Sequence, residues 1–214
     1  MMKKVLILLG LIVLSGCATH AEITMPTVTN VHDSAYENKT LNYEVLYSQP
    51  TPGIFSGGEQ LPLIPLNKAE LSVASASALK ELPKFIFNQL PVSVKYIANN
   101  AELTLKLEIT AHDKKGPAYS DHEFTKSLAK NLLTLGLASS EYNIIADFDV
   151  KYALVHNGKE VFSKEYKIKE EVDHEKGDFD AYNTLNEFTS QILEKHFILT
   201  LHNFFTEAAA YVKA

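Results

Sequence analysis

Residues 146–168 read ADFDVKYALVHNGKEVFSKEYKI, and this stretch decides the fold. On either side of Asn157-Gly158, apolar and polar residues alternate as they do along strands that are buried on one face. Asn-Gly is the strongest short-range signal for a tight turn between antiparallel strands. The stretch therefore predicts a β-hairpin with strands at 146–154 and 159–168.

Two registers are open for this hairpin. A two-residue turn would pair Tyr152 with Ser163 and would leave Phe162 on the opposite face. A three-residue loop with Gly158 as a G1 bulge would pair Tyr152 with Phe162. We prefer the bulged register, because it places the apolar side chains of both strands on one face. These side chains are Phe148, Val150, Tyr152, Leu154, Phe162, Tyr166 and Ile168.

Two more segments have the composition of strands. Residues 41–47 are rich in β-branched and aromatic side chains. Residues 101–111 alternate strictly, with apolar side chains at 103, 105, 107 and 109 and polar side chains between them. A strand of this kind has one face in the core and the other in water. Residues 49–65 carry four prolines and three glycines and predict a long loop.

The first helix is predicted to begin at Asn67. Asn67 and Glu70 form an N-cap-to-N3 pair, and Leu66 and Leu71 form a hydrophobic staple across it. Pro83 lacks a backbone donor and would clash with the preceding turn, so the helix must kink or restart there.

Two more helices are predicted further along the chain. Ser120 and Glu123 match a second capping box, which predicts a helix that Gly136 would end. The acidic stretch 170–178 is expected to be a turn. After it, apolar residues at helical spacing from Tyr182 to Tyr211 predict a long C-terminal helix.

This order of elements predicts an α+β fold. We expect a mostly antiparallel sheet of about four strands, with helices packed on one face and a long C-terminal helix. The chain of 214 residues suits one such domain better than two. Its net charge of −6 would repel phosphate backbones, so we expect no nucleic-acid partner.

The amino end has the features of an export leader. Lys3 and Lys4 precede an unbroken apolar run at 5–14, which is too short to cross a bilayer as a permanent helix. The run ends in Leu14-Ser15-Gly16-Cys17, and Cys17 is the chain's single cysteine. These four residues resemble the lipobox of bacterial membrane lipoproteins, at all four of its positions.

The resemblance implies that the leader 1–16 is removed and that Cys17 carries the lipid. In that class the cysteine sulfur receives diacylglycerol, and its new amino group is acylated. Ala18 follows, and the absence of aspartate there favours the outer membrane. We therefore predict a signal peptide at 1–16, a lipidated cysteine and flexible tether at 17–40, and a single periplasmic domain at 41–214.

The chain lacks the usual sequence signatures of catalysis or metal binding. The metalloprotease pattern HExxH is absent, and His196 and His202 are six residues apart on a predicted helix, so they cannot hold one metal together. Asp147 and Asp149 are expected on a solvated face of the sheet. We therefore expect no catalytic residue, no metal site and no cofactor.

Apolar residues in three places are candidates for a partner surface. Ile54 and Phe55 fall in the long loop 49–65, and Leu135 and Leu137 flank the Gly136 that would end the second predicted helix. The last helix adds Phe204 and Phe205. The alternative for the last two places is that their side chains form the core that covers the sheet.

The leading functional hypothesis is a non-catalytic, lipid-anchored envelope lipoprotein. It would be held in the outer membrane, face the periplasm and bind another component in envelope assembly or transport. A lipid-anchored hydrolase is one alternative, and a lipid-binding or lipid-shuttling domain is the other.

Overall fold

The computed structural model describes residues 21–53, 55, 58–123, 140–176 and 183–213. Within these residues the fold is α+β, as predicted, with a seven-stranded mixed sheet and a long C-terminal helix. The sheet is mostly antiparallel but larger than the four strands expected. Its strands are β1 (Thr40–Ser48), β2 (Ile64–Pro65), β3 (Lys95–Tyr96), β4 (Leu103–Ala111), β5 (Ala118–His122), β6 (Ser140–His156) and β7 (Lys159–Lys176).

The sheet is built around β6, which has 17 residues. One edge of β6 pairs with β7 over its whole length. The other edge pairs with β5 in the first part of β6 and with β4 from Phe148 to His156. β1 lies parallel to β4, and the short strands β2 and β3 pair with β1. The two helices α2 (Val73–Leu79) and α3 (Leu82–Asn88) connect these parallel strands.

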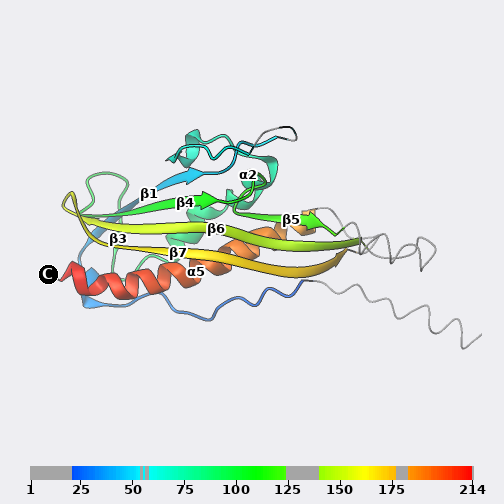
Figure 1. The fold of residues 1–214 in the computed structure, drawn as a ribbon. Coiled ribbons are helices and arrows are strands. Elements are labelled where there is room, and N and C mark those ends of the chain that lie inside the picture. Colours follow the sequence, from blue (N-terminus) through cyan, green and yellow to red (C-terminus); the bar gives the residue numbers. More distant parts are fainter. Residues whose placement is uncertain (1–20, 54, 56–57, 124–139, 177–182, 214) are drawn as a thin grey trace, which may run out of the picture.

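The core lies between one face of the sheet and the helix α5 (Asn183–Val212), which runs along it (Figure 1). On β4 every second side chain is buried, from Leu103 to Ala111, as the strict alternation predicted. Across the sheet these side chains are aligned with Leu154 and Tyr152 of β6. Burial of such side chains is the main stabilising contribution to the fold.

The hairpin forms where it was predicted, but in a different register. Asn157 and Gly158 have φ of 50° and 82° and make a two-residue turn between His156 and Lys159. The register shifts near Leu154, so that Leu154 lies opposite Phe162 and Tyr152 lies opposite Lys164. The predicted pairing of Tyr152 with Phe162 is therefore wrong by two residues. A shift of two residues keeps every side chain on the same face of the sheet, so the predicted apolar face is correct.

Two predicted helix starts are wrong. α2 begins after Ser72 rather than at Asn67, because the Ser72 hydroxyl accepts the hydrogen bond from the N–H of Ser75. Residues 118–122 form β5 rather than a helix starting at Ser120, because they pair with the part of β6 that β4 does not reach. The predicted break at Pro83 is confirmed: α2 ends at Leu79, and Pro83 lies in the first turn of α3.

Residues 170–176 of the acidic stretch expected to be a turn instead form the last part of β7, and residues 177–178 lie outside the described residues. Val172 and His174 point toward α5, while Glu171 and Asp173 alternate with them on the outer face. This segment was not predicted as a strand, because its side chains are mostly charged and so show little alternation between apolar and polar residues.

The predicted tether is wrong for residues 21–39, which lie against the domain and are called the strap here. The strap runs along α5 from one end of the molecule to the other (Figure 1). It buries Ala21, Val31, Ala35 and Tyr36 in the core. The strap has isolated apolar side chains among polar ones and so gives no periodic signal in the sequence, although four of these side chains pack into the core.

The strap is also held by hydrogen bonds along its length. The carbonyl oxygen of Thr29 accepts from Nδ1 of His202 at 3.0 Å, and the Tyr36 hydroxyl donates to the carbonyl oxygen of Phe205 at 2.7 Å. Where the strap ends in the 3-10 helix η1 (Ser34–Tyr36), Oδ1 of Asp33 accepts from the N–H of Ala35.

Candidate functional site

Phe204 and Phe205 are fully buried, so the partner surface predicted on α5 is wrong. The Phe204 ring lies 5.3 Å from the rings of both Tyr152 and Phe162, and Phe205 meets Tyr36 edge-on at 5.8 Å. These contacts show that the alternative, in which this part of the helix covers the sheet, is correct.

The other predicted site residues are placed as follows. Phe55, near the tip of the long loop, is 98% exposed. Cys17, Ile54, Leu135 and Leu137 lie outside the residues that the structure describes.

Three aromatic rings gather at one edge of the sheet, and we call them the edge aromatic cluster: Tyr43 of β1, Phe87 of α3 and Tyr96 of β3. The Tyr96 ring lies 5.6 Å from that of Tyr43 and meets Phe87 edge-on at 5.8 Å. Phe87 is 54% exposed and Tyr96 is 40% exposed. Large, partly exposed aromatic side chains of this kind are typical anchors in protein interfaces.

A hydrogen bond helps to position the Tyr43 ring. Its hydroxyl donates to the carbonyl oxygen of Pro83, in the first turn of α3, at 3.4 Å. Burial raises the pKa of Tyr43, and the nearby Tyr96 raises it further. This cluster was not predicted from the sequence, because its members come from three separate segments of the chain. The one available signal is that Phe87 falls outside the apolar stripe formed by Leu82, Phe85 and Ile86.

Basic side chains flank the edge aromatic cluster. Lys84 lies three residues before Phe87 on α3 and has a 69% exposed side chain. Lys95 precedes Tyr96 and is also exposed. The cluster is therefore an apolar surface with the exposed cation of Lys95 beside it, while Nζ of Lys84 lies 4.0 Å from Oε2 of Glu81.

The face of the sheet away from α5 is polar, as expected for Asp147 and Asp149. Nδ1 of His112 lies 2.6 Å from Oδ1 of Asp147, and its Nε2 lies 3.5 Å from Oδ2 of Asp149. Lys167 lies 3.8 Å from the same Asp149 oxygen. These charges neutralise one another on a hydrated surface, where each pair contributes little to stability.

Toward α5, an ionic cluster lies at the margin of the core. Glu170 of β7 accepts from Nζ of Lys195 at 2.6 Å, and Nε2 of His196 lies 2.8 Å from its other oxygen. Burial raises the pKa of Glu170, but the hydrogen bond and charge of Lys195 outweigh burial, so the pKa is lowered overall. Burial lowers the pKa of His196 despite the nearby carboxylate.

A hydrogen-bonded cluster lies beneath the long loop. Oε1 of the buried Gln49 accepts from the hydroxyls of Tyr47 at 2.8 Å and Ser75 at 2.5 Å. Ser72 and Ser75 both reach the carbonyl oxygen of Lys115. The cluster ties the loop, β1 and α2 together, which indicates a structural role.

An open groove of about 480 Å³ lies between α2, α3 and α5. Its lining is mostly polar and includes Lys80, Glu81, Lys84, Glu187 and Glu194. Burial raises the pKa of Glu194, and the charge of Lys84 opposes this change. Carboxylates and ammonium groups lie together in the groove, so it has no single charge to select a ligand.

In the described part of the chain, no three histidine, cysteine or acidic side chains are placed to hold a metal ion. None of the described helices is long and apolar enough to cross a membrane.

The comparisons with known proteins give low similarity throughout. No protein-family model matches the chain, and no curated protein matches it. Among solved structures, a Xanthomonas campestris protein of the DUF330 family has 12% identity and a TM-score of 0.39, covering 89% of this chain and 98% of that one. A putative neuraminyllactose-binding hemagglutinin homolog from Helicobacter pylori has 10% identity and a TM-score of 0.45, covering 91% and 97%.

The rare lipoprotein B of Shewanella oneidensis has 14% identity and a TM-score of 0.30, covering 80% of this chain and 94% of that one. The chain is thus similar over most of its length to structures that include a named lipoprotein, at scores too low to assign it a function.

Proposed function

We propose that this chain is a lipid-anchored envelope protein that binds a protein partner rather than catalysing a reaction. The anchor rests on the leader 1–16 and on the match of residues 14–17 to the lipobox. Ala18 after the lipidated cysteine favours the outer membrane, with the domain facing the periplasm.

The edge aromatic cluster carries the binding part of the proposal. Phe87 and Tyr96 present large apolar surfaces to solvent, where an aromatic anchor gains most from being covered. The adjacent Lys95 adds positive charge, and Lys84, which lies 4.0 Å from Glu81, is a second cation that an acidic partner could engage. The partner that fits is a protein with an apolar side chain surrounded by acidic residues, because opposite charges at the rim favour encounter and orientation.

The anchor is tested by acyl labelling in a Gram-negative host. The wild-type chain should incorporate labelled palmitate, and globomycin, which blocks the lipoprotein signal peptidase, should leave the leader uncleaved. Cys17→Ser should incorporate none, and its precursor should stay uncleaved by the lipoprotein pathway. Equal labelling of wild type and Cys17→Ser would overturn the anchor.

The binding role is tested by photocrosslinking in intact cells. A photoreactive phenylalanine analogue replaces Phe87, and the same analogue at Lys167, whose side chain is 79% exposed on the outer face, is the matched control. We expect a protein adduct of defined mass at position 87 and none at 167. Lys84→Glu combined with Lys95→Glu should reduce that adduct strongly. No adduct at 87, or the same adduct at both positions, would contradict the proposal.

A further inference from the structure

The first described residue of the strap is fixed to the domain. The N–H of Ala21 donates to Nδ1 of His174 at 3.0 Å, and both residues are buried. The His174 ring packs against Phe188 of α5 at 4.7 Å. The chain therefore leaves the domain at a defined point rather than from a flexible tether.

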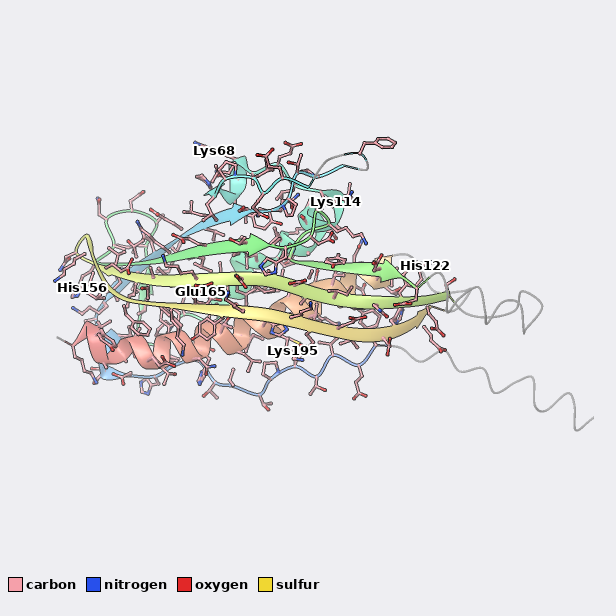
Figure 2. All side chains as sticks on the ribbon, in the orientation of Figure 1. Lys68, Lys114, His122, His156, Glu165 and Lys195 are labelled. Atoms are coloured by element: carbon pink, nitrogen blue, oxygen red, sulfur yellow. The ribbon has the colours of Figure 1, made fainter. Side chains whose placement is uncertain are left out.

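This exit point lies at one end of the long sheet. His174 pairs with Tyr142 on β6, which pairs with His122 on β5, and within the described residues the pairing of β6 with β7 ends two residues further, at Ser140 and Lys176. Figure 2 shows His122 at this end and His156, beside the hairpin turn, at the opposite end.

Only Ala18, Thr19 and His20 separate Cys17 from this exit point. Four residue steps span at most about 14 Å even when fully extended. The 22-residue tether expected from the sequence would have had a reach of ~25 Å and complete freedom of direction. With the strap docked, the lipid on Cys17 must enter the membrane close to Ala21.

We propose that the domain stands on the membrane with the end that carries His122, Tyr142 and Ala21 against the lipid headgroups. This proposal rests on the proposed lipid anchor and adds the orientation of the domain. The hairpin turn at Asn157-Gly158 then points away from the membrane. The 18 residues of β7 at about 3.3 Å each give the sheet a length of ~60 Å, so the turn stands far above the headgroups.

The chemistry of the end fits neutral rather than anionic lipid. Tyr142 and His122 stack edge-on at 5.0 Å, and rings with a polar edge are the side chains that favour the headgroup layer. Carboxylates lie near them in the chain: Glu141 of β6 and Asp121 of β5 are on the other face of the sheet, where Asp121 pairs with Nζ of Lys115 at 2.7 Å, and Glu22 follows Ala21 on the strap. A negatively charged lipid surface would repel these groups, whereas the ammonium of phosphatidylethanolamine would attract them.

The long sides of the domain are less suited to the membrane. The outer face of the sheet is lined by charged side chains such as Glu108, Lys151 and Lys167. Pressing that face against lipid would remove many charges from water at once, which is costly. The end-on orientation leaves them hydrated.

The orientation is tested by site-specific quenching in vesicles of phosphatidylethanolamine and phosphatidylcholine. The sulfur of Cys17 is consumed by lipidation, so an introduced cysteine is the only free thiol in the mature full-length protein. An environment-sensitive fluorophore is attached in His122→Cys at the membrane end, in Lys167→Cys along the outer face, and in Lys159→Cys beside the hairpin turn. The quencher is a nitroxide on the lipid headgroup.

We expect at least five-fold stronger quenching at position 122 than at 159, with position 167 close to 159. Inserting about 20 Gly and Ser residues between Thr19 and His20 should remove this difference while the protein still floats with the vesicles, because the flexible chain then frees the domain. Equal quenching at 122 and 159, or the strongest quenching at 167, would overturn the orientation although the protein is bound. Failure to float, with no lipid on the protein by mass spectrometry, would instead overturn the proposed anchor, on which the orientation depends.

Discussion

The Tyr36 hydroxyl donates a 2.7 Å hydrogen bond to the backbone carbonyl oxygen of Phe205, and this bond joins the strap to the last third of α5 across 169 positions of the chain. Tyr36 is completely buried, and its ring packs edge-on against that of Phe205. Burial raises the pKa of Tyr36 far above its usual value, so the hydroxyl keeps its proton and remains a donor.

Tyr36→Phe keeps the ring and removes only this hydrogen bond. We expect it to lower the free energy of unfolding by about 1 kcal/mol, which corresponds to a fall in Tm of roughly 2–4 °C for a domain of this size. Thermal unfolding followed by circular dichroism measures the change. Tyr211→Phe, at a half-exposed ring near the end of α5, is the matched control and should leave Tm unchanged. An equal fall in both variants would show that the strap bond contributes nothing specific.

Gly158→Val should destabilise the domain by about 1–2 kcal/mol, because a β-branched residue is strained at a φ of 82°. A Cβ at this position has nothing within 4 Å, so the effect isolates the backbone conformation. Gly158→Asn is the control, since asparagine tolerates this region and should cost much less. Denaturant unfolding of the two variants checks the prediction, and a Val variant as stable as the Asn variant would contradict it.

Phe205→Glu should abolish folding of the domain, because it places a charge in the core without a partner. Phe55→Glu is the matched change at a side chain that is 98% exposed, and it should leave the Tm within error of wild type. Circular dichroism and melting curves of the two variants decide the matter. A folded Phe205→Glu protein with an unchanged midpoint would mean that the last helix faces something other than the sheet.

His196 should make the domain less stable as the pH falls from 7 to 5. Burial lowers its folded pKa below the usual value of about 6.5, so the folded state favours the neutral ring. The stability that the neutral His196 contributes is fully present above pH ~6.5, the usual histidine pKa, and is lost as the pH falls through the lowered folded pKa. Glu170 also has a lowered pKa, so its contribution is lost only at still lower pH, below the usual glutamate value.

The test compares the Tm at pH 7 and at pH 5 for wild type and for His196→Gln, which keeps a polar contact with Glu170 and does not titrate. The fall in Tm should be smaller in the variant. His32→Gln, at an exposed position on the strap, should fall as much as wild type. If His196→Gln falls as much as wild type, His196 does not set the pH dependence.

The parts of the fold that were predicted correctly have local and periodic signals. The alternation from Leu103 to Ile109 fixed both the strand and its buried face, and the break at Pro83 followed from the chemistry of one residue. The turn at Asn157-Gly158 was found for the same reason. Its register was not, because a shift near Leu154 depends on the packing of both strands along their whole length.

The features that were missed depend on contacts between distant segments. Ser120 and Glu123 match a helix start, yet the free edge of β6 makes a strand the better partner for residues 118–122. Ala21 and Tyr36 were predicted to lie in a tether, because no local sequence pattern indicates that their hydrogen-bond partners are His174 and Phe205. The edge aromatic cluster joins β1, α3 and β3 and gives no motif in sequence order.

The strap has a consequence for the timing of export. It is the first part of the domain to be synthesised, and its later part bonds to residues in the first half of the chain, such as Leu90 and Val92. Its first described residues depend on partners that are made much later, because Ala21 bonds to His174 and Thr29 bonds to His202. The part of the strap nearest Cys17 therefore has nothing to dock onto until most of the chain has been made. On the proposed lipid anchor, Cys17 is therefore modified before Ala21 docks beside His174, and the domain takes its fixed place on the membrane afterwards.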